Sequence, residues 1–229
     1  MLEVIYLVFN EGYSATAGDD WMRPQLCLDA LRLGRVLAQL ASDEPEVHGL
    51  VSLMEIQASR SRARVGPDGE PVLLLEQDRR KWDHMLIRRG LAGLERAEAL
   101  STALGPYTLQ AAIAACHARA RTGDDTDWAR IAALYGALAQ MTQSPVVELN
   151  RAVAVSMAVG PAPALEIIDS IADEPALQSY HLLPSVRGDF LHKLGRMEEA
   201  RAEFERAAAM TRNSRERDLL LNRAASCSS

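Results

Sequence analysis

The segment VRGDFLHKLGRMEEARAEFERAAAM, residues 186–210, constrains the fold of this chain more than any other stretch. Gly188 and Ala200 are small enough to let two helices cross closely, and Gly195 can end the first of them. Phe204 and Ala207 follow at the spacing that would seal the seam to a third helix. The segment therefore predicts a helix hairpin that stacks on a further helix.

This spacing matches a tetratricopeptide repeat, in which each helix hairpin buries its apolar face only by stacking on its neighbours. A weaker copy lies upstream, where Ala152 and Gly160 precede Ala164. Ala164 and Ala200 are 36 positions apart, close to the repeat length of about 34. A third, more degenerate hairpin can pair residues 107–121 with 128–141. We therefore expect a tetratricopeptide-like solenoid in the C-terminal half.

The sequence predicts an all-α fold for the whole chain. Ala and Leu are abundant and aromatic residues make up only 5% of the sequence, which favours close helix packing over β-structure. Apolar residues recur at helical spacing between Gly, Pro and short polar separators. Gly12 is expected to end the first helix as a left-handed cap. The expected helices are 2–9, 22–41, 44–58, 79–104, 107–121, 128–141, 146–159, 162–171, 180–194, 197–210 and 214–225.

Residues 60–75 interrupt the helical pattern. An Asp68-Gly69 turn is flanked by residues that favour extended backbone, which predicts a small β-hairpin or an ordered loop. We expect an N-terminal helical subdomain over residues 1–104, with this insertion, and helical repeats over 105–229. The two parts are expected to pack as one unit.

Composition excludes several classes of protein. The formal net charge of −6 and a pI near 5.4 argue against direct nucleic-acid binding by this chain. Three cysteines without metal-like spacing indicate a reducing compartment. The apolar runs are too short to span a bilayer and no signal peptide is recognisable, so a cytoplasmic location is expected. Because apolar residues begin directly after Met1, we expect the chain to be a piece of a longer protein.

Two polar groups in the N-terminal part are candidate contact residues. Asn10, Glu11 and Tyr13 follow an apolar helix and can contact a partner or a small effector, or can simply cap that helix. Trp82 and Asp83 can line a pocket with Tyr13. Alternatively, the Trp packs inward and the Asp favours the helix dipole.

A third candidate group lies in the repeats. Asn150, Arg151 and Arg187 would flank the inner groove of a helical stack, where such side chains bind partner segments. The alternative is an intramolecular network of salt bridges and hydrogen bonds. No nucleotide-binding or hydrolase motif is present, and the histidines lack the spacing of a helical zinc site. We therefore expect no catalytic residues, no metal and no cofactor.

Seven stretches together resemble one bacterial family. They are YLVFNEGYSA (6–15), DEPEVHGLVSLM (43–54), LLLEQDRRKWD (73–83), GPYTLQAAIAACHA (105–118), DTDWARIAALY (125–135), SPVVELNRAVAV (144–155) and YHLLPSVRGDFLHKLGR (180–196). The series resembles the C-terminal extension of extracytoplasmic-function RNA polymerase sigma factors of the sigma-70 family. In that group tetratricopeptide-like repeats follow sigma regions 2 and 4, and neither region is recognisable here.

The resemblance implies a regulatory, non-enzymatic domain that contacts the sigma regions, RNA polymerase or a partner protein. Promoter binding would belong to the missing sigma regions, and no membrane contact is implied. An alternative is a small-molecule-sensing module with a pocket between the N-terminal helices and residues 60–75. A third possibility, an enzyme, would require Glu11, Tyr13, His48 and Asp83 to converge in one cleft.

Overall fold

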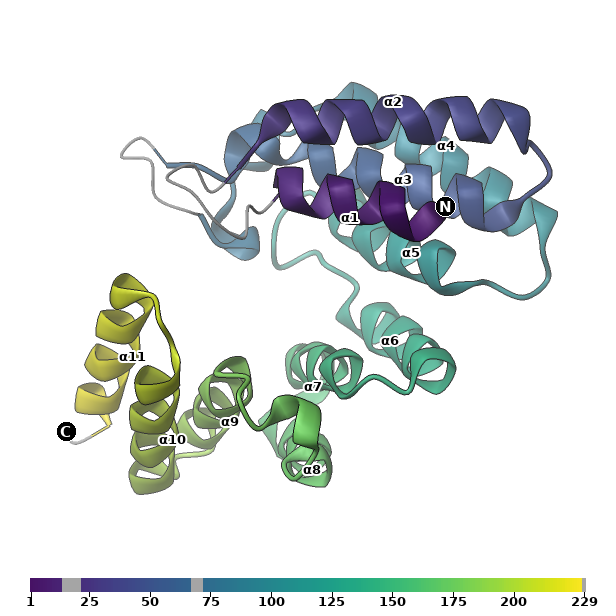
Figure 1. Ribbon diagram of the computed structural model, residues 1–229. Helices are drawn as coiled ribbons and strands as arrows, with labels where there is room; N and C mark the ends of the chain where they lie inside the picture. Colours follow the sequence, from purple (N-terminus) through teal and green to yellow (C-terminus); the bar gives the residue numbers. More distant parts are fainter. Residues whose placement is uncertain (14–21, 67–71, 228–229) are drawn as a thin grey trace. The chain divides into compact units, whose positions relative to one another are not determined.

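The structure, a computed structural model, describes residues 1–13, 22–66 and 72–227, with the side chain of residue 215 outside that description. Within these ranges the chain forms eleven α-helices and four short 3-10 helices, with no strand. The helices pack as sequential antiparallel pairs, so the predicted all-α class is confirmed. The chain divides into two compact units, Met1–Asp127 and Trp128–Ser229 (Figure 1).

The N-terminal unit contains five α-helices and three 3-10 helices among its described residues. They are α1 (Leu2–Tyr13), α2 (Pro24–Leu40), α3 (Pro45–Ser59), η1 (Ser61–Ala63), η2 (Leu74–Glu76), η3 (Arg79–Lys81), α4 (His84–Leu100) and α5 (Pro106–Arg119). Proline occupies the start of α2, α3 and α5, where its missing N–H costs no hydrogen bond. These prolines explain why the predicted starts of the three helices agree closely with the observed ones.

Helix α3 is the centre of the N-terminal unit. It contacts α2, α4 and α5, and ten of its fifteen residues are buried. Such burial on all sides is expected of a helix surrounded by others. Two glycines allow the close approach: a Cβ on Gly49 would lie 2.4 Å from Thr108 Oγ1, and one on Gly90 would lie 2.6 Å from Ile56. Helix α5 therefore belongs to the N-terminal unit, which ends at Asp127 and not at the predicted position 104.

The predicted β-hairpin over residues 60–75 is wrong for the part that the structure describes. The chain leaves α3 as the 3-10 helix η1 and re-enters through η2, so few residues remain extended. Between the described residues of the two sides, the N–H of Val72 donates a hydrogen bond to the carbonyl of Arg64, 2.8 Å. The predicted Asp68-Gly69 turn lies outside the described residues.

Gly12 is not the left-handed cap that the sequence suggested. Helix α1 continues to Tyr13, and the described glycines with positive φ are Gly160 and Gly195. Gly12 is buried because α2 passes close by, and a Cβ there would lie 2.6 Å from the backbone nitrogen of Cys27. The glycine is needed for a close approach between helices and not for a turn.

The C-terminal unit contains six α-helices and one 3-10 helix in its described residues. They are α6 (Trp128–Thr142), α7 (Pro145–Val159), α8 (Pro161–Ile171), η4 (Pro175–Leu177), α9 (Leu182–Lys193), α10 (Met197–Met210) and α11 (Ser214–Ser226). Gly160 ends α7 with a φ of +105°. Gly195 follows α9 with a φ of +76°. Both values fall in the region that glycine adopts without strain.

The small residues singled out in residues 186–210 lie at helix crossings. Gly188 on α9 faces Phe204 on α10, and an added Cβ would come within 2.8 Å of the ring. Ala200 and Ala207 are fully buried, and they share one core with Phe204 and with Leu220 of α11. The hairpin and the third helix expected from this segment are therefore present.

Candidate functional site

A cavity of about 570 Å³ opens in the N-terminal unit. Its walls come from the C-terminal ends of α1 and α3, the first two turns of α4, the 3-10 helix η1 and one face of α2. The backbone N–H of Asp83 donates to the carbonyl of Ser59, 2.8 Å, and this bond holds the start of α4 against the end of α3. The ends of several packed helices therefore frame the cavity.

The inner wall of the cavity is apolar. Cys27 and Leu31 on α2 are buried, and Ala58 on α3 lies beside them. Leu28 and Met85 also line the cavity, but their side chains are largely exposed. Burial raises the pKa of the Cys27 thiol to about 11, against a smaller opposing effect of Arg64. The thiol is therefore neutral near pH 7 and behaves as an apolar wall atom.

Three arginines line the same cavity: Arg35, Arg62 and Arg89. Arg35 Nη2 pairs with Glu55 Oε1 at 2.8 Å, and the Glu55 side chain is buried. Burial raises the pKa of Glu55, while the hydrogen bond from Arg35 and the charge of Arg89 lower it. Arg62 and Arg89 form no hydrogen bond or ion pair among the described residues.

Asp83 is the carboxylate among the described residues of the lining. Its Oδ1 accepts from the N–H of Met85 at 2.9 Å and of Leu86 at 3.1 Å, so it caps the N-terminus of α4. The carboxylate is thereby engaged by backbone donors. The balance of charge around the cavity is positive.

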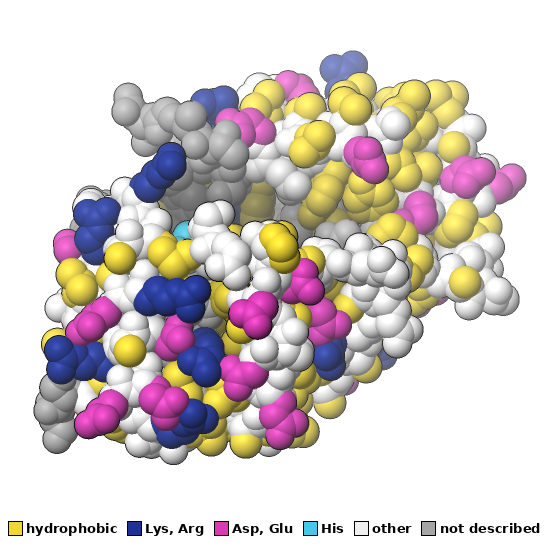
Figure 2. Space-filling view, turned by 60° about the horizontal axis from the view of Figure 1, so that its bottom comes forward, with side chains coloured by type: hydrophobic (Ala, Val, Ile, Leu, Met, Phe, Trp, Pro, Cys, Tyr) yellow, Lys and Arg dark blue, Asp and Glu magenta, His cyan; other side chains and the backbone are white. Residues whose placement is uncertain are grey.

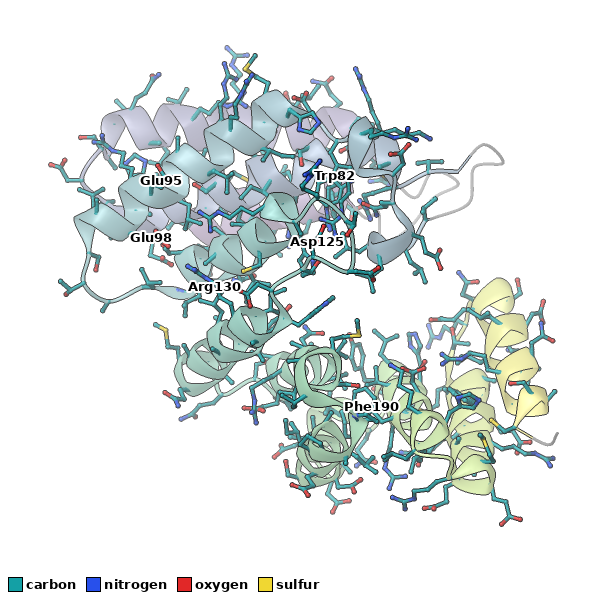
Figure 3. The ribbon with its side chains drawn as sticks, turned by 180° about the vertical axis from the view of Figure 1, so that it is seen from behind. Trp82, Glu95, Glu98, Asp125, Arg130 and Phe190 are labelled. Carbon is teal, nitrogen blue, oxygen red and sulfur yellow. The ribbon has the colours of Figure 1, made fainter. Side chains whose placement is uncertain are left out.

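A cluster of arginines and aromatic rings adjoins the cavity. Arg60 Nη2 donates to the Tyr13 hydroxyl at 2.5 Å, and its guanidinium lies 5.9 Å from the ring centres of both Tyr13 and Trp82. The guanidinium carbon of Arg79 lies 4.9 Å from the centre of the Trp82 ring, and both residues precede α4 in the chain. Trp82 is only 4% exposed and lies among side chains of the N-terminal unit (Figure 3). Cation–π contacts of this kind stabilise half-buried arginines such as Arg60 and Arg79.

The same cluster reaches α5 through Arg79. Its Nη1 donates to the backbone carbonyls of His117 and Ala120, the latter at 3.0 Å. His117 is 9% exposed, and burial, assisted by the charges of Arg60 and Arg79, lowers its pKa to about 4. The imidazole is therefore neutral over most of the physiological pH range.

The structure brings two of the predicted N-terminal residues to the cavity: Tyr13 and Asp83 both line it. Trp82 is buried beside Arg60 and is not part of the lining. Glu11 pairs with Arg23 at 3.0 Å, and Asn10 hydrogen-bonds the Tyr6 hydroxyl. Neither of these two residues is in the lining.

His48 also lies outside the lining of the cavity. Its Nε2 is 2.9 Å from the carbonyl of Ser42 and 3.2 Å from Arg96 Nε. Of the four side chains that an enzyme would have to bring into one cleft, the cavity therefore holds Tyr13 and Asp83. In the described residues, no group of three or more His, Cys, Asp and Glu side chains is arranged to hold a metal ion.

The predicted residues of the C-terminal unit make intramolecular contacts. Arg187 on α9 pairs with Asp169 on α8 at 2.9 Å and with Glu203 on α10 at 2.7 Å, so it ties three helices together. Arg151 pairs with Glu148 one turn earlier on α7, 2.7 Å. Asn150 is exposed on the same helix.

The sequence reasoning missed the arginines of the cavity. Leu28, Leu31 and Arg35 stand three and four positions apart, so they share one face of α2, and this spacing could have been noticed. Arg62 and Arg89 carry no such signal. They belong to different elements and resemble ordinary solvated side chains.

The fold and the cavity define the chain as an all-α protein of paired helices with a pocket in its N-terminal unit. Residues 1–98, which contain the entire described lining, match the family described as "Family of unknown function (DUF6596)". The chain is also similar to an uncharacterized protein of Rhizobium meliloti (strain 1021), with 46% identity over 213 residues. That match covers 93% of this chain and 50% of the relative, so the chain spans about half of the relative's length.

Neither of these descriptions names a sigma factor. No solved structure matches the chain. None of the helices in the described ranges has the length and apolar character needed to cross a membrane.

Proposed function

We propose that this chain is a regulatory, non-enzymatic protein-interaction domain of a longer cytoplasmic protein of the extracytoplasmic-function sigma-factor type. In this proposal the domain contacts sigma regions 2 and 4 of the same polypeptide and so controls transcription initiation by RNA polymerase. The stacked hairpins of its C-terminal unit are tetratricopeptide-like. The domain itself does not bind nucleic acid, consistent with its net charge of −6.

An exposed apolar stripe on α1 and α2 carries the proposal. Val4 and Leu7 lie on the face of α1 opposite the buried Ile5 and Phe9, and Leu7 is 67% exposed. Leu33, Val36 and Leu40 lie at helical spacing on α2, and Leu40 is 81% exposed. We call these five residues the α1–α2 stripe.

Helices α1 and α2 contact each other, and exposed apolar side chains on neighbouring helices are a feature of interaction surfaces. Figure 2 shows hydrophobic side chains gathered over the N-terminal unit, at the upper right, whereas charges of both signs are interspersed over the C-terminal unit. Since the relative is about twice as long as the matched region, the part of such a protein outside the match is the occupant we propose for the stripe. The resemblance of the seven stretches supports assigning that part, in this proposal, to the sigma regions.

The test uses the full-length protein. Leu33→Asp combined with Leu40→Asp should weaken binding between the domain and the separately purified remainder by at least about tenfold, because two carboxylates would be buried at the interface. Promoter-dependent transcription by the full-length variant should change in parallel. Gln39→Asp, an exposed polar position on the same helix, is the matched control. Unchanged binding and transcription in the double variant, with an unchanged unfolding temperature, would refute the proposal.

The cavity favours a second candidate function, a small-molecule-sensing domain that controls the same sigma factor. A pocket of about 570 Å³ lies within the size range of sites for small ligands, roughly 300–1,000 Å³. A thermal-shift screen in which no small molecule raises the unfolding temperature would argue against it.

A further inference from the structure

We infer that the cavity of the N-terminal unit binds an amphipathic organic anion, a carboxylate carried on an apolar acyl or aromatic body. This inference deepens the second candidate function and rests on it only for the biological consequence of binding. It concerns the residues Cys27, Leu31, Ala58, Arg35, Arg62 and Arg89.

The shape and chemistry of the wall select an apolar body. Leu31, Ala58 and the neutral thiol of Cys27 offer no strong polar group, so a polar ligand would lose its hydration there without replacement. The hydroxyls of Ser59 and Ser61, also in the lining, already donate to the carbonyls of Ile56 and Ala58 at 2.6 and 2.8 Å. Burial of hydrocarbon is therefore the main favourable term available in the depth of the cavity.

The charges of the lining select an anionic head. Arg62 and Arg89 are cations that form no hydrogen bond or ion pair among the described residues, and Arg35 directs part of its guanidinium to Glu55. A carboxylate can accept two parallel hydrogen bonds from a single guanidinium, the strongest geometry for such a pair. An anion at the mouth would thus complete contacts that the described chain leaves open.

A cationic ligand would find no comparable partner. Asp83 is engaged by two backbone N–H groups, and Glu55 is engaged by Arg35. A cation would therefore have to displace a helix cap or a buried ion pair and would meet the like charges of the arginines. Nothing in the described lining resembles a glycine-rich phosphate cradle, so an apolar carboxylate fits better than a nucleotide.

The experiment compares three probes of equal chain length with the complete 229-residue chain: octanoate, 1-octanol and octylammonium. Isothermal titration calorimetry and the shift in unfolding temperature report binding. We expect octanoate to bind at one site and to stabilise the fold, with 1-octanol weaker by about tenfold or more and octylammonium weaker still. Acetate, which has the head without the apolar body, should not bind.

Variants locate the site. Combining Arg62→Ala with Arg89→Ala should weaken octanoate binding about tenfold or more, whereas Arg32→Ala, an exposed arginine of α2 outside the lining, should not. Leu31→Trp should fill the cavity and abolish binding. Because that variant can fail to fold, Leu28→Glu at the exposed mouth provides a second test, since its carboxylate would repel the ligand.

Three results would overturn the inference. They are the absence of octanoate binding, equal binding of all three probes, and equal loss of binding in the Arg62/Arg89 double variant and the Arg32 variant. Binding of octanoate with no effect of any carboxylate on transcription would leave the site in place and refute the sensing function alone. The two failures are therefore distinguishable.

Discussion

Glu46 on α3 caps the N-terminus of α5 through Thr108. Its Oε1 accepts from the N–H of Thr108 at 3.0 Å and from the Thr108 hydroxyl at 2.6 Å, while Oε2 accepts from the N–H of Tyr107 at 2.8 Å. A carboxylate at this position satisfies donors that the first turn of a helix leaves open and also favours the helix dipole. The cap comes from another helix, so it fixes tertiary structure as well as a helix end.

The first prediction is that Glu46→Gln lowers the free energy of unfolding by about 1–2 kcal/mol, because the amide lacks the negative charge and leaves one acceptor oxygen for the donors of Thr108 and Tyr107. Urea denaturation followed by circular dichroism measures it. Glu44→Gln is the matched control, since that side chain is exposed and makes no capping bond. Equal stability of the two variants would show that the Glu46 cap contributes nothing.

The second prediction concerns the crossing of α9 and α10. Gly188→Ala would place a Cβ 2.8 Å from the Phe204 ring, and the repacking should cost about 1–3 kcal/mol. Gly136→Ala on α6 should be neutral or stabilising by up to about 1 kcal/mol, because the nearest atom to its Cβ is 3.8 Å away and alanine is the better helix former. Thermal unfolding compares the two. A Gly188→Ala variant as stable as Gly136→Ala would contradict the close crossing.

The third prediction concerns the ion pairs of Arg187 with Asp169 and Glu203. Because Arg187 is partly exposed, solvent screening reduces their contribution, and Arg187→Met should destabilise the C-terminal unit by about 1 kcal/mol. Arg201→Met, which breaks an exposed pair with Glu205 within α10, should cost less than about 0.5 kcal/mol. Denaturation at low and high salt tests both. If Arg187→Met destabilises the protein no more than Arg201→Met, the ion pairs of Arg187 have no structural role.

The fourth prediction is a pH dependence due to His117. Its pKa is about 4 in the folded protein and near 6.5 when unfolded, so the unfolded state binds the proton more readily. The contribution is therefore fully present above pH 6.5 and is lost as the pH falls toward 4, by about 3 kcal/mol in total. His117→Gln should flatten this part of the stability profile.

The exposed His192 provides the control for that profile. His192→Gln makes the same substitution at a histidine whose side chain is exposed on α9. Carboxylates contribute to the same range in all three proteins, so the difference between the two variants isolates His117. Parallel profiles for both variants would show that His117 is not buried in its neutral form.

The sequence determined the helices of this protein because their signals are local. Proline at the first position of α2, α3, α5, α7 and α8, and glycine with positive φ after α7 and α9, depend only on the backbone of a few neighbouring residues. The spacing of the small residues Gly188 and Ala200 likewise predicted that two helices cross closely there. The all-α class and the final hairpin therefore followed from sequence alone.

Local sequence signals gave a wrong prediction at two places in the N-terminal unit. The Asp68-Gly69 pair favours a hairpin, but the described flanks continue as 3-10 turns from α3 and toward η3. Gly12 could have ended a helix, yet the approach of Cys27 on α2 is what requires a glycine there. For Gly12, packing against a distant segment therefore outweighed the local preference.

The cavity became visible only in the tertiary structure. Leu31 on α2, Arg62 on η1 and Arg89 on α4 line one space because α3 is surrounded by its neighbours and its end is tied to the start of α4. Each arginine taken alone has the spacing of a solvated surface residue, and its relation to the apolar wall arises from residues far apart in the chain. Helix signals are short-range properties of the backbone, whereas a binding site depends on long-range packing that no local pattern encodes.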